Sequence, residues 1–248
     1  MDAACEPDEP VTVRAVFFDV DFTLIYPGPT FHGEGYRRFC ARYDIDVDPA
    51  QFDTATAASS FILDEVQEQI YTHDLFIHYT ASIIEHMGGR GPRVVEAARE
   101  IYEEWASNHH FEIYDDAAPV LKMLQERGLR VGIISNSHRS LDAFCEHFSL
   151  RDLIHASVSS SEHGYMKPHR SIFDAALEKA GVPANAALMV GDSLKHDVEG
   201  ALAAGMRAVL LRRSGEVPAG LPSNVPVIRT LAELPDLLSH EGTKAAKS

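Results

Sequence analysis

Residues 16–25 read VFFDVDFTLI, an apolar run of strand length that two aspartates, Asp19 and Asp21, interrupt. An uncompensated carboxylate inside a buried strand is energetically costly. The branched and aromatic residues before Asp19 favour a strand, so this aspartate marks the point where the strand ends. We therefore expect the two aspartates either to have a compensating partner or to serve a chemical role.

Four further apolar runs resemble this first strand; they span residues 130–136, 153–160, 186–192 and 207–213. Helical patterns lie between the runs, at residues 117–128, 140–148, 170–181 and 197–205. Strands that alternate with helices predict an α/β fold, in which helices cover both faces of a doubly wound parallel sheet. Ligands bind such a sheet at the carboxyl ends of its strands.

Residues 29–108 break this alternation, because they carry helical periodicity without strand-like runs. We expect them to form an all-helical subdomain inserted after the first strand. The α/β core then comprises residues 12–28 and 109–240. Residues 1–11 are expected to be a disordered head and residues 241–248 a frayed tail.

Composition limits the classes of partner. The chain has 248 residues, a net charge of −15 and no basic patch, which argues against nucleic acid and anionic membranes as partners. The three cysteines, Cys5, Cys40 and Cys145, are odd in number and lack CxxC spacing, which favours a reducing compartment. No secretory signal pattern is present, and no window approaches the roughly 18 apolar residues of a membrane span. We expect a soluble, cytoplasmic protein.

Polar residues recur where the predicted strands end or helices begin. They are Asp19, Asp21 and Thr23, then Ser135 and Asn136, then Lys167 before Pro168, and then Gly191, Asp192 and Ser193 with Asp197. Each motif alone also fits a turn, a surface lysine or a helix cap. Together they resemble the haloacid dehalogenase (HAD) superfamily, whose phosphatases carry DxDx[TV], a Ser or Thr, a Lys, and GDxxxxD or a relative in this order. The resemblance covers Asp19 to the last strand, and the insertion is similar to the helical cap of that superfamily's first cap class.

The resemblance implies a Rossmann-like core and a Mg²⁺-dependent hydrolase, a phosphatase of small-molecule phosphate monoesters that works through an aspartyl-phosphate intermediate. Asp19 is the expected nucleophile, and Asp21 the expected general acid and base. Lys167 is expected to stabilise the charge-rich transition state and Asp19 itself. The expected partner is a small phosphorylated metabolite, with the chain acting as a monomer or a homodimer.

Mg²⁺ is usually held by one or two carboxylates together with water and phosphate. Asp19 and Asp192 are expected to supply these carboxylates, and Asp21 a backbone carbonyl. The cation and Lys167 would then gather positive charge that this acidic chain lacks elsewhere. The expected phosphoryl-binding residues are Ser135, Asn136 and Thr23, and those expected to orient the metal ligands or Lys167 are Asp197 and Ser193.

Two alternatives remain open, a 2-haloacid dehalogenase and a catalytically idle binding protein. HAD dehalogenases lack an acid at the position of Asp21, so this residue favours phosphate esters over haloacids. Phe22 stands where the superfamily usually has a small or polar residue, and it is the sequence hint for an idle protein. We expect the backbone at Phe22 not to need a positive φ, and the ring to pack under the helical subdomain.

The histidines do not form a metal motif, since none of the thirteen shows HxH or HExxH spacing. We interpret them, including the adjacent pair His109 and His110, as solvated or structural. Cys40 and Cys145 are interpreted as small core residues. Specificity is expected to reside in residues 29–108, and a sugar phosphate, a phosphoglycolate-like acid and a nucleotide all remain open as substrates. The candidate specificity residues are His32, Arg37 and Arg38.

Overall fold

The computed structural model describes residues 12–66 and 68–245, so the expected head, residues 1–11, lies outside the described residues. Its centre is a six-stranded parallel sheet with the strand order β5-β4-β1-β6-β7-β8. The strands are β1 (Ala15–Phe18), β4 (Arg130–Ser135), β5 (Ala156–Ser159), β6 (Ala187–Gly191), β7 (Arg207–Leu211) and β8 (Val227–Ile228). The predicted parallel sheet is confirmed, and β8 is an addition that the sequence pattern did not indicate.

Helices cover both faces of this sheet because alternate residues of β1 enter two separate cores. Phe18 packs in the core with α6, α7 and α11, whereas Phe17 packs in the core with α9 and α10. The helices of this region are α6 (Ala117–Glu126), α7 (Leu141–His147), α8 (Ser160–His163), α9 (Arg170–Ala180), α10 (Gly200–Ala203) and α11 (Leu234–Ala245), with the short turns η4 (Ala184–Ala186) and η6 (Leu231–Glu233). Helix α11 extends into the residues expected to form the tail.

The helix expected at residues 197–205 begins earlier than predicted. A π-helical turn, η5 (Leu194–Glu199), precedes α10, and the Ser193 side chain caps it by accepting a hydrogen bond from the backbone N–H of His196. This cap fixes the direction in which the chain leaves β6, directly after Gly191 and Asp192.

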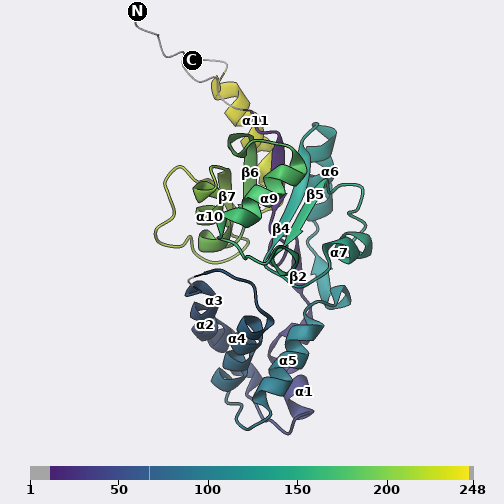
Figure 1. Cartoon of the computed structure of the whole chain (residues 1–248), viewed down its shortest axis with the longest axis vertical. Coiled ribbons are helices and arrows are strands. Elements are labelled where there is room, and N and C mark those ends of the chain that lie inside the picture. The colour runs from purple at the N-terminus through teal and green to yellow at the C-terminus, as the bar shows by residue number, and fades with distance from the viewer. Residues whose placement is uncertain (1–11, 67, 246–248) are drawn as a thin grey trace, which may run out of the picture.

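Between β1 and β4 the chain forms a group of helices, which we call the helical segment (residues 29–110). It comprises η1 (Pro29–Phe31), α1 (Gly33–Ala41), η2 (Pro49–Gln51), α2 (Phe52–Ser59), α3 (Phe61–Asp64), α4 (His73–His86), α5 (Val94–Glu104) and η3 (Asn108–His110). Figure 1 shows α1–α5 gathered at one end of the molecule, away from the sheet. The buried face of α5 contains Ala97 and Ala98, whose small side chains let neighbouring helices approach closely.

The two connections to the helical segment pair with each other. Strand β2 (Ile25–Pro27) leads into it and β3 (Phe111–Ile113) leads out, and the two strands run antiparallel. The sequence pattern did not indicate either strand, because three residues are too short to show a period of two.

Cys40 and Cys145 are buried free thiols, as expected for small core residues. Within residues 12–66 and 68–245, none of the helices combines the length and the apolar character needed to cross a membrane.

Candidate active site

Three neighbouring strands end at the same edge of the sheet, and each places one predicted site residue there. Asp19 directly follows β1, Ser135 ends β4, and Asp192 directly follows β6. Because β1 pairs with β4 on one side and with β6 on the other, their carboxyl ends lie next to each other. The backbone N–H of Asp19 donates to the Val190 carbonyl at 3.0 Å, which extends the pairing of β1 with β6 beyond the strand.

Lys167 lies between two carboxylates at this edge. Its Nζ atom is 2.6 Å from Oδ1 of Asp19 and 2.6 Å from Oδ1 of Asp197. The lysine is 2% exposed, so these charges interact with little screening by water. Although burial alone would lower the pKa of Lys167, the carboxylates of Asp19 and Asp197 raise it above the usual value. Lys167 is therefore a fixed positive charge beside Asp19.

Asn136 holds the main chain of Lys167 from both sides. Its Nδ2 atom donates to the Lys167 carbonyl at 2.9 Å, and its Oδ1 atom accepts from the Lys167 N–H at 2.7 Å. This pair of hydrogen bonds ties the loop after β4 to the residue that carries the ammonium. The amide of Asn136, expected at the phosphoryl group, thus contacts Lys167 in this structure.

Asp197 reaches Lys167 because the residue at the end of β6 has no side chain. A Cβ atom at Gly191 would lie 2.2 Å from Oδ2 of Asp197, a distance that no packed side chain tolerates. The same Oδ2 atom accepts a hydrogen bond from the Ser193 N–H at 3.0 Å. The glycine of the Gly191-Asp192 motif is therefore required for the close approach of the Asp197 carboxylate.

Three carboxylates converge beside this lysine. One oxygen each of Asp19, Asp192 and Asp197 lies within 4.8 Å of the others. Burial raises the pKa of Asp19 to about 7 against the opposing effect of Lys167. Burial and the neighbouring Asp19 and Asp197 raise the pKa of Asp192 well above its usual value. Full ionisation of three carboxylates beside one ammonium would leave an excess of two negative charges, so this donor set fits a hard divalent cation such as Mg²⁺.

Two buried hydroxyls at predicted phosphoryl-binding positions have no partner within the described residues. They are Oγ of Ser135, a residue 1% exposed, and Oγ1 of Thr23, a residue 0% exposed. A buried hydroxyl without a hydrogen bond is costly, so such atoms indicate a missing partner. An anionic oxygen would satisfy the Ser135 hydroxyl at the end of β4.

Asp21 lies apart from the three-carboxylate group and contacts an arginine that sequence reasoning missed. Its Oδ1 atom is 3.1 Å from Nη1 of Arg139, whose side chain is 0% exposed. Arg139 follows Ser135 by four residues, in the loop after β4. A lone arginine in a polar loop gives no sequence signal of burial, because the partner that compensates its charge is far away in the chain.

The expectations for Phe22 were wrong in both respects. Its φ is +63°, in the left-handed region, and its side chain is 46% exposed rather than packed under the helical segment. The backbone N–H of Phe22 donates to the Ile25 carbonyl at 2.7 Å, which closes a tight loop after Asp21. A left-handed non-glycine residue costs roughly 1–3 kcal/mol, so the loop after β1 holds strain at this position.

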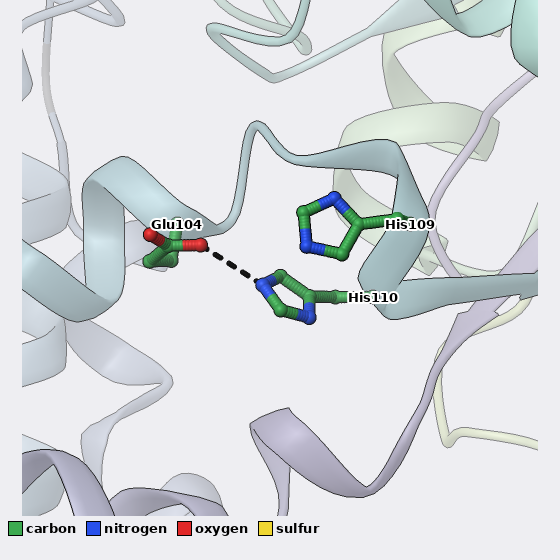
Figure 2. Close-up of side chains that lie close together, drawn as sticks. All are labelled: Glu104, His109 and His110. Carbon is green, nitrogen blue, oxygen red and sulfur yellow. Dashed lines mark hydrogen bonds and ion pairs between the residues drawn. The ribbon is translucent and has the colours of Figure 1, made fainter.

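The adjacent histidines His109 and His110 lie in the turn η3, and Figure 2 shows both beside Glu104. Nε2 of His110 is 2.9 Å from Oε2 of Glu104, and the His110 ring packs edge-on against Phe31 with centroids 5.4 Å apart. The centroids of the two histidine rings are 4.0 Å apart, because the chain forms a turn here. His110 thus has structural contacts, but one ligand atom each of Glu104, His109 and His110 also lies within 4.8 Å of the others, an arrangement that could hold a metal ion. The interpretation of this pair as structural therefore stays a prediction.

Among the contacts that the structure describes, none joins a candidate specificity residue to Asp19, Asp192 or Asp197. Arg37 pairs with Glu34, His32 packs edge-on against Phe52, and Arg38 is an exposed residue.

Instead, Tyr102 of α5 stacks on His138, which is three residues after Ser135, with centroids 4.0 Å apart. The Tyr102 hydroxyl also forms a hydrogen bond of 2.8 Å with Nδ1 of His73. Tyr102, with His73 beside it, is therefore one point at which the helical segment contacts the loop after β4.

His138 is neutral in this environment. Burial, and then the electrostatic influence of His73 and of the Arg139 guanidinium, lower its pKa to about 4. Its Nε2 atom is buried without a partner within the described residues. Tyr102, His73 and His138 were not predicted from the sequence, since their proximity depends on how the helical segment sits on the sheet.

Comparisons with known proteins agree with this fold and place the chain in a family. A family model described as a haloacid dehalogenase-like hydrolase matches residues 13–205. The ribulose-1,5-bisphosphate 5-phosphatase of Halopiger xanaduensis is 29% identical over 241 residues, which cover 91% of this chain and 99% of that protein. The N-acylneuraminate-9-phosphatase of Mus musculus is 29% identical over 255 residues, with coverage of 95% and 98%.

Among solved structures, the HAD-hydrolase YfnB of Bacillus subtilis is 20% identical and superimposes with a TM-score of 0.73, covering 92% of this chain and 99% of that one. This likeness shows the same fold. The family match spans the helical segment and the strands that carry Asp19, Ser135 and Asp192. The chain therefore belongs to the haloacid dehalogenase-like hydrolase family.

Proposed function

We propose that the chain is a Mg²⁺-dependent phosphatase of small-molecule phosphate monoesters. The observation that carries this proposal is the buried Lys167 ammonium, 2.6 Å from both Asp19 and Asp197, beside a third carboxylate. This arrangement provides a nucleophile, a fixed positive charge and a cation site at one edge of the sheet. The similar proteins named as phosphatases support the same reaction class.

Asp19 acts as the nucleophile. One carboxylate oxygen attacks the phosphorus as the bond from phosphorus to the ester oxygen breaks, which gives an aspartyl phosphate. Asp21 donates a proton to the leaving oxygen. Water then attacks the aspartyl phosphate and Asp21 takes the proton back, so phosphate leaves and Asp19 is restored. Lys167 stabilises the negative charge of Asp19 and of the phosphoryl group throughout.

The residues that would hold Mg²⁺ are Asp19 and Asp192 through their carboxylates and Asp21 through its backbone carbonyl. When bound, the cation neutralises the repulsion between an anionic nucleophile and an anionic ester. Asp197 orients Lys167, and Ser193 holds Asp197 through its backbone N–H.

Ser135 donates its hydroxyl to a phosphoryl oxygen, which is the partner that its buried Oγ lacks. Thr23 is assigned to the same group because its buried hydroxyl is also unpaired. Asn136 contributes indirectly, since its two hydrogen bonds to the main chain of Lys167 place that lysine.

Residues 29–108 act as a helical cap over the core formed by residues 12–28 and 109–240. A cap that closes over the sheet edge excludes water and favours small metabolites over proteins as substrates. Buried free thiols at Cys40 and Cys145 support a cytoplasmic location, and the net charge of −15 disfavours nucleic acid as a partner. The protein acts as a monomer or a homodimer.

A panel of phosphate monoesters tests the proposal. The wild-type protein is expected to release phosphate from p-nitrophenyl phosphate and from at least one metabolite, and EDTA or Asp19→Asn is expected to abolish release. Asp46→Asn, at an exposed loop residue, is the matched control and should retain activity. Halide release from 2-haloacids without phosphatase activity would replace the proposal with a dehalogenase. Inactivity on the whole panel with Mg²⁺ present would favour an idle binding protein.

A further inference from the structure

Arg139 is the bulkiest fully buried side chain among those whose burial the structure describes, in residues 12–66 and 68–239. Removing a guanidinium from water is costly unless a carboxylate and hydrogen bonds compensate for the lost hydration. The groups around Arg139 therefore indicate what the side chain does. Nothing in the catalytic scheme above uses it.

The guanidinium contacts three separate segments. Nη1 donates to Oδ1 of Asp21 at 3.1 Å, and Nη2 donates to the Trp105 carbonyl at 3.0 Å. The same guanidinium lies over the ring of Phe111 at 4.3 Å from its centroid. Asp21 belongs to the loop after β1, Trp105 directly follows α5, and Phe111 is the first residue of β3. The Arg139 side chain thus connects Asp21, the expected general acid and base, to the segment between α5 and β3, where the chain returns from the helical segment to the sheet.

The backbone of Arg139 is fixed as well. Its N–H donates to Oγ of Ser137 at 2.9 Å, and Ser137 is 4% exposed. Both residues lie in the loop after β4 that also carries Ser135 and Asn136. Arg139 therefore reaches Asp21 from an anchored position, so that its guanidinium can restrain a carboxylate in a loop that is strained at Phe22.

We propose that Arg139 is a positioning residue, which holds the Asp21 carboxylate for proton transfer and couples it to the segment between α5 and β3. The inference rests on the proposed phosphatase function. Because Oδ1 of Asp21 accepts from Arg139, Oδ2 is the oxygen that carries the proton to the leaving group. Arg139 neither gains nor loses a proton during the reaction; it sets which oxygen of Asp21 faces the ester.

The kinetic test compares leaving groups. An alkyl phosphate such as glycerol phosphate needs a proton on its leaving oxygen, whereas p-nitrophenyl phosphate leaves as a stabilised anion. Arg139→Met is expected to lower kcat on glycerol phosphate about tenfold or more beyond its effect on p-nitrophenyl phosphate, with a smaller change in KM. Arg139→Lys should recover part of the loss, because it keeps the charge but lacks the planar fork. Arg170→Met, at a side chain 67% exposed, is the control and should leave both substrates unaffected.

A second measurement needs no turnover. Trp105 is the single tryptophan of the chain, and its ring packs 4.5 Å from Phe31 and 5.0 Å from Phe111. Its fluorescence therefore reports on the segment between α5 and β3. Asp21→Asn is expected to change the emission maximum and acrylamide quenching of Trp105 when Arg139 is present. The same substitution should produce no change in an Arg139→Met background, since the connection is then absent.

The outcomes separate this inference from the proposed function. If the wild-type protein hydrolyses no ester of the panel, the phosphatase proposal fails and the Trp105 measurement alone judges the coupling. If it hydrolyses the panel but not glycerol phosphate, another alkyl phosphate of the panel that it hydrolyses replaces glycerol phosphate in the comparison. An equal loss of kcat on both esters, or the same Trp105 response to Asp21→Asn in both backgrounds, would overturn the role of Arg139. If Arg139→Met does not fold, Arg139→Lys is compared with wild type on the two esters, and an unchanged ratio of kcat values overturns the role in the same way.

Discussion

The Asp197 carboxylate lies where a side chain at residue 191 would be: a Cβ atom at Gly191 would lie 2.2 Å from Oδ2 of Asp197. The carboxylate comes this close because Ser193 donates its N–H to the same oxygen and Lys167 binds the other one. The end of β6 is thus shaped to let Asp197 reach the lysine beside Asp19.

Gly191→Ala is expected to displace the Asp197 carboxylate and with it Lys167. Misplacing a catalytic group by about 1 Å costs roughly a hundredfold in rate, so we expect a loss of kcat of that order on any substrate found. Overpacking should also lower the free energy of unfolding by roughly 1–3 kcal/mol. Steady-state kinetics and urea unfolding measure the two effects. A variant with unchanged kcat would contradict the role given to this contact.

Replacing Lys167 by Met is expected to abolish measurable turnover. The substitution leaves Asp19 and Asp197 buried without their shared counter-charge, and loss of one partner from a buried ion pair costs roughly 3–5 kcal/mol of stability. Thermal unfolding in the absence of divalent cations measures this loss. Lys122→Met, at a side chain 69% exposed, is the matched control. Comparable destabilisation of the two variants would show that the Lys167 pairs contribute no net stability.

The positions of Asp19, Ser135 and Asp192 could be predicted from the sequence because parallel strands end at a common edge of a sheet. Lys167 could be placed only through the family resemblance, since 148 residues separate it from Asp19. Arg139 and His138 could not be predicted, because their contacts with Trp105 and Tyr102 depend on how the helical segment packs against the loop after β4.

The error at Phe22 has a different origin. Its positive φ follows from one local hydrogen bond to the Ile25 carbonyl, which the residue type alone does not reveal. The short strands β2 and β3 were missed for a related reason, since their pairing is set by the two ends of a long insertion and not by a periodic pattern.

His138 predicts a loss of stability in mild acid. Its pKa is lowered to about 4 in the folded protein, by burial and by His73 and Arg139, while the unfolded chain keeps the ordinary value of 6.5. Between these values the unfolded state binds more protons, so the free energy of unfolding falls as pH falls from 6.5 towards 4. Relative to wild type, His138→Gln should remove roughly 1–2 kcal/mol of the decrease between pH 7 and pH 5. Urea unfolding of both proteins at both pH values measures this difference. An equal decrease in the free energy of unfolding of wild type and His138→Gln would contradict the role of His138.

The Asp116 carboxylate links the start of α6 to the segment after β7 and to the start of η6. Its carboxylate accepts two hydrogen bonds from Arg213, at 2.8 and 2.9 Å, and one from the Leu231 N–H at 2.9 Å. Arg213 also donates to the Thr23 carbonyl at 2.9 Å. Asp116→Asn is expected to lower the free energy of unfolding by roughly 2–4 kcal/mol, because the amide cannot replace the bidentate charged pair. The neighbouring, exposed Asp115→Asn is the control, and equal effects of the two substitutions in urea unfolding would refute the role of the network.

The charge of the carboxylate group predicts that Mg²⁺ stabilises the folded protein. Asp19, Asp192 and Asp197 face one ammonium, so their full ionisation in the folded state would leave an excess of two negative charges that the extended chain does not bring together. A cation at a hundred times its dissociation constant should raise the free energy of unfolding by about 2.7 kcal/mol. Thermal unfolding with and without Mg²⁺ measures the shift, and Asp192→Asn is expected to remove most of it while Asp46→Asn preserves it. An equal shift in Asp192→Asn would mean that the cation binds elsewhere, and the cation site proposed beside Lys167 would have to be abandoned.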